Sequence, residues 1–173
     1  FLGIGGSSSS TSREVTDFGV KITGALGDLI KGIGQYLVYE TVKTVSSSSS
    51  SGFWGIGGGS STSTNYNTQY KSLESQVIGT LQALFINASN AIVSSADRLG
   101  IYTVDQIEQK LAAAQINLDI STFGLTGEEA LADVMAEIGV ELNKVVSVAY
   151  PFLTEFQRLG EGLTTTLARV TTD

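Results

Sequence analysis

A block of aromatic and glycine residues, followed by a serine and threonine tract, occurs twice in this chain. The sequence FLGIGGSSSSTS begins at Phe1, and FWGIGGGSSTST begins at Phe53, 52 residues later. Weaker matches continue at the same offset, such as Phe18 with Tyr70. A period of about 50 residues is typical of repeat architectures and suggests a duplication. The alternative is that two low-complexity segments resemble each other by chance.

The composition excludes several classes of function. Serine, threonine and glycine number 21, 18 and 20 among 173 residues, and there is no Cys and no His. Disulfides, thiolate or imidazole metal sites, and catalysis by Ser-His-Asp or Cys-His groups are therefore ruled out. A net charge of −7 disfavours nucleic acid, which binds basic surfaces. We expect a protein that is not an enzyme and has no nucleic-acid partner.

The spacing of hydrophobic residues predicts an all-α fold, a bundle of three long helices and one short helix in a single domain over residues 1–173. The first helix is expected over 12–45, with Thr11 and Glu14 as its capping box. Its apolar stripe comprises Val15, Phe18, Ile22, Leu26, Leu29, Ile33 and Leu37. Five internal glycines weaken such a helix, so a closely packed partner is expected to compensate.

The remaining helices are expected over 65–99, from 103 to about 115, and from 127 to about 170. Two further capping boxes support this prediction, because Thr103 precedes Gln106 by three residues and Thr126 precedes Glu129 by three. Pro151 predicts that the last helix is kinked or broken near that residue. Residues 117–124 are expected to form a loop, and we expect no strands.

Two low-complexity segments, 1–11 and 46–64, contain the repeated blocks. The second is much longer than the connections usual in helical bundles, so it is long enough to span a helix or to exchange one with a neighbouring subunit. Each block holds apolar side chains that either anchor a loop to its own bundle or dock onto another copy. The candidates for self-association are Phe1, Leu2, Ile4, Phe53, Trp54 and Ile56.

No other pattern predicts a catalytic, cofactor or metal site. Asp133, Glu137 and Glu141 lie four residues apart, but acids near a helix start are more simply explained by the helix dipole and solvation. The glycine-rich segments lack the Lys and Ser or Thr of a phosphate-binding loop. Asn87 begins the sequence Asn-Ala-Ser, a possible glycosylation site in a secreted protein.

The chain starts at Phe1, and its one Met is Met135. This start fits a secreted, extracellular protein whose signal peptide was removed before Phe1; a trimmed fragment is the alternative. There is no run of 18 apolar residues, and the uncharged stretch 75–96 is interpreted as a buried helix.

Helical units that alternate with serine-rich tracts resemble, in composition and layout, the repeat domains of silk-type proteins such as wrapping-silk spidroins. The resemblance implies a helical unit that assembles into a fibre or coat. We therefore expect a structural protein that associates with itself into a homo-oligomer or filament through helix packing and the aromatic-glycine loops. The alternative is an amphipathic-helix protein that binds lipid or acts as a surfactant, because residues 24–34 resemble a membrane-active peptide.

Overall fold

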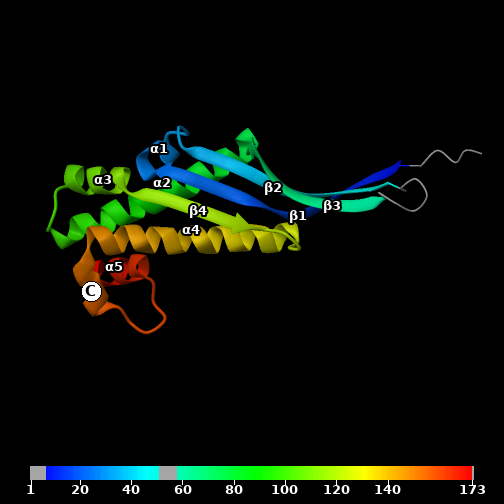
Figure 1. Ribbon diagram of the computed structural model, residues 1–173. Helices are drawn as coiled ribbons and strands as arrows, with labels where there is room; N and C mark the ends of the chain where they lie inside the picture. The colour runs from blue at the N-terminus through cyan, green and yellow to red at the C-terminus, as the bar shows by residue number, and fades with distance from the viewer. Residues whose placement is uncertain (1–6, 51–57, 173) are drawn as a thin grey trace, which may run out of the picture.

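The structure, a computed structural model, describes residues 7–50 and 58–172. Along this part of the chain it combines a sheet with helices (Figure 1). The strands are β1 (Ser7–Ala25), β2 (Gln35–Ser50), β3 (Gly59–Ser72) and β4 (Gln115–Ser121). The helices are α1 (Leu26–Ile30), α2 (Ser75–Leu99), α3 (Val104–Ala113), α4 (Gly127–Ala149), η1 (Pro151–Phe156, a 3-10 helix) and α5 (Leu163–Thr172). The predicted all-α bundle is therefore wrong.

The four strands form one antiparallel sheet in the order β3-β2-β1-β4. The helices pack against one face of it, around β4 and the adjoining ends of β1 and β2 (Figure 1). In β4, Ile116, Leu118 and Ile120 are buried beneath the helices, while the residues between them are exposed. This alternation with a period of two is the pattern of a strand with one covered face, and it replaces the loop expected there.

The helix expected over 12–45 is β1, α1 and β2. Ile22, Leu26 and Leu29 of the predicted stripe are fully buried, because a strand followed by a short helix also brings them to the core. Thr11 and Glu14 lie in β1, so they form no capping box. Residues 36–45 are rich in β-branched and aromatic side chains, which favour a strand over a helix.

The expected long connection at 46–64 also has a different structure. Ser46–Ser50 forms the end of β2, and β3 begins at Gly59 and pairs antiparallel with it. The second expected helix, 65–99, is therefore strand up to Ser72, and its helical part starts at Ser75. Leu81, Phe85 and Ile92 of α2 enter the core.

After residue 100 the starts of α3 and α4 follow the sequence signals, but the helix expected from 127 to about 170 is divided into α4, η1 and α5, with a turn at 157–162. Both capping boxes are present, Thr103 with Gln106 at α3 and Thr126 with Glu129 at α4. Helix α4 ends at Ala149, and Pro151 opens the 3-10 turn η1. Proline is tolerated in a first turn because its missing N–H has no helical partner there.

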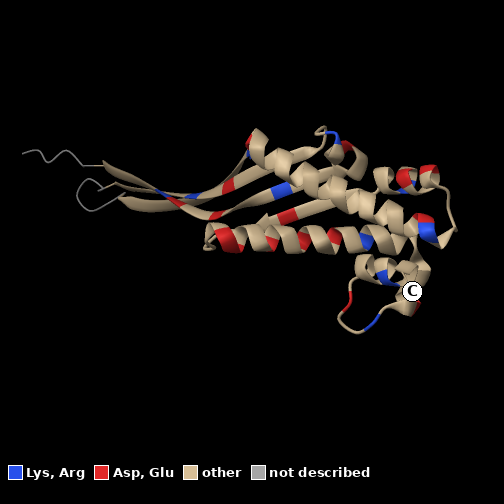
Figure 2. Ribbon diagram, turned by 180° about the vertical axis from the view of Figure 1, so that it is seen from behind, with Lys and Arg blue, Asp and Glu red and all other residues tan. Residues whose placement is uncertain are grey.

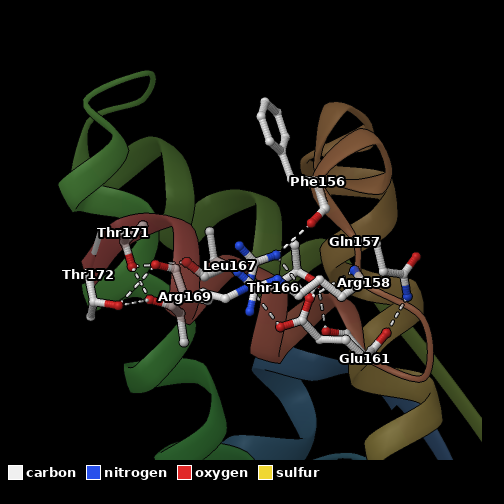
Figure 3. A network of polar contacts seen from close by, with 11 residues as sticks. Phe156, Gln157, Arg158, Glu161, Thr166, Leu167, Arg169, Thr171 and Thr172 are labelled. Carbon is white, nitrogen blue, oxygen red and sulfur yellow. Dashed lines mark hydrogen bonds and ion pairs between the residues drawn. The ribbon is translucent and has the colours of Figure 1, made fainter.

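The carboxylate of Glu161 links the C-terminal helix α5 to the turn before it (Figure 3). Arg169 donates to it from Nε and Nη2 at 3.0 and 3.1 Å. Thr166 Oγ1 and the backbone N–H of Arg158 donate to the same side chain at 2.9 and 3.1 Å. These bonds, led by those from Arg169, lower the pKa of Glu161 from its ordinary 4.5 to about 2. The network joins the turn at 157–162 to α5, which packs between α2 and α4.

Helix α2 is, by length and composition, apolar enough to cross a membrane, the one such helix in the part of the chain that the structure describes. Only 22% of its most apolar window is buried. Its exposed face carries small and uncharged polar residues such as Thr80, Asn87 and Asn90. One face of α2 enters the core, but the prediction that the stretch 75–96 is a buried helix is wrong for most of the helix surface.

Candidate functional site

Strands β1, β2 and β3 extend well past the end of β4 and form an arm that projects beyond the helices (Figure 1). The last β4 residue, Ser121, pairs with Gly19, which is level with Tyr39 and Tyr70 in the sheet. We define the arm as residues 7–18, 40–50 and 59–69. It is a three-stranded ribbon with both faces open in its distal part, where β1 and β3 are exposed throughout.

Serine and threonine side chains bond to one another across the strands of the arm. Ser8 pairs with Ser49 at 2.7 Å between hydroxyl oxygens, and Ser10 with Ser47 at 2.6 Å. Between β2 and β3, the hydroxyl oxygens of Ser48 and Ser61, and those of Thr41 and Thr68, are each 2.8 Å apart. Such cross-strand pairs are a main source of sheet stability. The serine tracts are therefore ordered by pairing within the chain.

The sequence repeat coincides with the register of the sheet. Ser7 of β1 and Gly59 of β3 both pair with Ser50 of β2, and they are 52 residues apart. The same offset holds up to Val15 and Asn67, which both pair with Val42. Strands β1 and β3 run in the same direction, because each is antiparallel to β2. The repeated blocks thus lead into two strands that carry similar residues at equal levels.

The distal arm carries no charge among its described residues. Figure 2 shows charged residues mainly on the helices and on the part of the sheet near them. In the arm they are Arg13, Glu14 and Asp17 of β1 with Glu40 and Lys43 of β2, and β3 has none from Gly59 to Tyr70. The ends of the three strands therefore present only serine, threonine and glycine over residues 7–12, 46–50 and 58–64.

The outer edge of β3 pairs with no other strand among residues 7–50 and 58–172. Leu73 N–H donates to Tyr36 O at 2.9 Å, so in the alternating antiparallel pattern the odd-numbered residues of β3 bond to β2. The even-numbered residues, from Ser60 to Ser72, therefore direct their N–H and C=O groups away from the sheet. Proteins usually protect such an edge with charges, proline, a bulge or a covering helix. The β3 edge has only Lys71, near its base.

The outer edge of β1 is open only in the arm. Beyond Phe18 it is paired with β4, and Thr122 N–H donates to Phe18 O at 2.8 Å. A β-bulge lies between Val15 and Asp17. This bulge and the nearby charges protect the edge close to the helices, whereas Ser7–Ser12 has no such feature.

The outer edge of β4, in contrast, is covered. Glu141 of α4 is only 7% exposed, and its carboxylate accepts the backbone N–H of Asn117 at 3.3 Å. Its other oxygen is paired with Lys144, one turn further along the helix. Of the three acids spaced four residues apart, Glu141 therefore stabilises the β4 edge, while Asp133 and Glu137 are exposed.

A cross-strand contact anchors the arm at its base. The ring of Tyr39 in β2 lies over Gly19 in β1, where an added Cβ would be 2.7 Å from the ring. Burial first, then the nearby Asp17 and Asp119, raise the pKa of Tyr39 to about 12. Lys21 of β1 approaches Asp119 of β4 at 4.0 Å.

The predicted self-association residues, Phe1, Leu2, Ile4, Phe53, Trp54 and Ile56, lie outside the described residues. In the chain they adjoin Ser7, Ser50 and Gly58, at the distal end of the arm. The sequence had not indicated the strand edges themselves. Two features of the sequence indicate these strands. One is the run of β-branched residues in β2, and the other is the constant offset of 52 residues between the two blocks and the tracts that follow them.

The other predicted sites remain predictions. Asn87 is exposed on α2, and nothing in the structure tests whether it is glycosylated. Within residues 7–50 and 58–172, no group of three or more His, Cys, Asp or Glu side chains is placed to hold a metal ion. Comparison with protein-family models, curated proteins and solved structures gives no match to this chain.

Proposed function

We propose that this protein is a non-enzymatic structural protein, acting outside the cell, that associates with itself through the strand edges of its arm. The observation that carries the proposal is the long, open edge of β3, which has no charged residue from Gly59 to Tyr70. Unpaired N–H and C=O groups along such an edge bind another strand readily. We do not propose that copies associate through helix packing, because the all-α bundle expected from the sequence is replaced by a sheet with helices.

A second copy is the partner whose chemistry fits this edge. The arm presents hydroxyl groups that already bond to one another within the sheet, as Ser8 does with Ser49. A neighbouring arm would extend the same pairing with the same residue types. The aromatic-glycine blocks adjoin the distal end of the arm in sequence, and we propose that they add an apolar contact between copies.

Proline at an edge position provides the test. The N–H of Thr64 points away from β2, so Thr64→Pro removes an edge donor without removing a bond inside the sheet. We expect Thr64→Pro to keep the circular dichroism of the wild type and to weaken association about tenfold or more, since proline blocks strand addition. Sedimentation velocity over a concentration series measures this.

Thr64→Val is the matched control, because it changes the same side chain but retains the N–H. It is expected to associate as the wild type does. A wild-type protein that stays monomeric at every concentration would refute the proposal, and binding to liposomes by that monomer would favour the lipid-binding alternative. Phe53→Ser combined with Trp54→Ser tests the blocks: association should weaken while helical circular dichroism is retained.

A further inference from the structure

We propose that the arms join head to tail, β3 of one copy beside β1 of the next, and close into a β-barrel in which neighbouring copies are displaced along the strands. This inference rests on the proposed function and specifies its geometry. It follows from strand direction, from the residues on the two edges and from the different lengths of those edges.

Strand direction allows this contact. Because β1 and β3 run the same way, placing β3 of one copy beside β1 of the next keeps every arm pointing in one direction. The two surfaces in such a contact differ, so repeating it generates either a ring or an open filament. The distal ends of all arms, with their uncharged serines and threonines, then lie at the same end of the assembly.

The residues on the two edges match. Ser7–Ser12 of β1 and Gly59–Thr64 of β3 lie level on either side of β2 and have nearly the same composition. The four-residue displacement derived below would place Ser7–Ser12 opposite Ser63–Thr68, which are likewise uncharged Ser, Thr, Asn and Tyr residues. Strand β2 already pairs with both of them, through Ser10 with Ser47 and Ser48 with Ser61. A serine-rich strand is thus compatible with either sequence as its neighbour.

The lengths of the two edges require a displacement. Ser72, the last residue of β3, pairs with Leu37 and is level with Lys21 of β1. The free edge of β1 ends at Phe18, where Thr122 bonds to it. Without displacement, β3 would therefore overlap β4 of the next copy. The shift must be an even number of residues, because an odd shift would place neighbouring side chains on opposite faces of the sheet. The smallest even shift that avoids the overlap with β4 is about four residues, or roughly 13 Å at 3.3 Å per residue.

This displacement has the size that a closed barrel needs. Each copy contributes three strands, about 14 Å of sheet width at 4.8 Å per strand. A shift of roughly 13 Å across that width corresponds to a strand tilt of about 43°, within the 35–45° typical of β-barrels. A barrel would also pair Ser7–Asp17 of β1 with Ser63–Ser72 of β3 in the neighbouring copy. Closure therefore covers most of the exposed β3 edge that an isolated copy presents.

Disulfide crosslinking tests the arrangement, because the chain has no native cysteine. With a shift of four residues, Ser10 of one copy lies opposite Tyr66 of the other, on the same face of the sheet. With no shift, Ser10 lies opposite Thr62. Within one copy β2 separates Ser10 from Thr62 by about twice the 4.8 Å strand spacing, and Tyr66 is farther still, so neither pair can form a disulfide. Each double-cysteine variant therefore reports only contacts between copies.

We expect oxidation of Ser10→Cys/Tyr66→Cys to give a ladder of covalent oligomers, and Ser10→Cys/Thr62→Cys to give at least tenfold less. Tyr66→Cys alone should give no dimer. A dimer from Tyr66→Cys alone would show that two β3 edges pair about a two-fold axis and would overturn the head-to-tail arrangement. Electron microscopy of the wild type should show closed rings, and open filaments would overturn closure.

These outcomes are separate from failure of the proposed function. If sedimentation shows no association, the self-association proposal itself fails. If the protein associates through the Thr64 edge but gives the wrong crosslinks, only the barrel geometry fails. Dithiothreitol should reverse every crosslink, and circular dichroism of the reduced variants should match that of the wild type.

Discussion

Tyr39 lies across Gly19 on the neighbouring strand, so the ring occupies the space that a side chain at residue 19 would need. A Cβ at Gly19 would also be 2.1 Å from the backbone oxygen of Ile120, which cannot move aside as a side chain can. We expect Gly19→Ala to destabilise the fold by about 1–3 kcal/mol, the usual cost of overpacking. Urea unfolding followed by circular dichroism measures the change.

Gly79→Ala is the control for this substitution. Gly79 lies in α2 with no atom within 4 Å of an added Cβ. Because alanine loses less conformational entropy in a helix, we expect a gain of about 0.5–1 kcal/mol. Equal effects at Gly19 and Gly79 would contradict the close approach of Tyr39 and Ile120.

Glu141 is expected to stabilise the β4 edge through the N–H of Asn117. Glu141→Leu leaves that N–H without its acceptor, which should cost about 1–3 kcal/mol. Hydrogen exchange at the Asn117 amide should become faster. Glu141→Gln retains a side-chain oxygen and should recover most of the loss, whereas the exposed Glu137→Leu should change stability little. Unaltered exchange at Asn117 in Glu141→Leu would argue against the bond.

The capping box at α4 gives a third prediction. Thr126 Oγ1 accepts from Glu129 N–H at 3.3 Å, and Thr126 N–H donates to Glu129 Oε2 at 2.8 Å. Thr126→Ala removes the hydroxyl acceptor and should cost about 1 kcal/mol in thermal or urea unfolding. Thr165→Ala, at an exposed position within α5, should instead be neutral or stabilising by a few tenths of a kcal/mol. A neutral Thr126→Ala would show that the cap contributes nothing.

The sequence predicted the C-terminal part of the fold better than the N-terminal part. At α3 and α4 the cap residues and the apolar spacing agree with each other, so Thr103, Thr126 and Pro151 mark real boundaries. In β1 the apolar residues Phe18 and Ile22 happen to lie four apart, which also fits a helix. The choice between strand and helix there depends on pairing with β2 and β4, which spacing within one segment does not reveal.

The candidate surface was only half visible in the sequence. The repeated blocks predict self-association, but the prediction that their offset of 52 residues marks a duplicated helical unit is wrong. The offset is instead the distance along the chain between level positions on β1 and β3, as Ser7 and Gly59 show. The edges depend on strand order, and strand order arises from contacts between segments far apart in the chain. The strict alternation of Ile116, Leu118 and Ile120 is a strand signal, and the prediction of a loop over 117–124 is wrong because it does not take this alternation into account.

The low pKa of Glu161 predicts how acid affects the C-terminal helix. The folded-state pKa is about 2, below the ordinary 4.5, so the carboxylate contributes stability that is fully present above about pH 4.5. That contribution is lost as the pH falls from 4.5 toward 2, because the proton then competes with Arg169. Glu161→Gln should remove this part of the pH dependence and lower stability at neutral pH. Urea midpoints measured from pH 7 to pH 2 for both proteins give the difference directly.

Glu155→Gln, at an exposed residue of η1, should leave the wild-type profile unchanged. If the urea midpoints of Glu161→Gln and the wild type change in parallel between pH 4.5 and 2, the pairing of Glu161 with Arg169 does not make stability depend on pH.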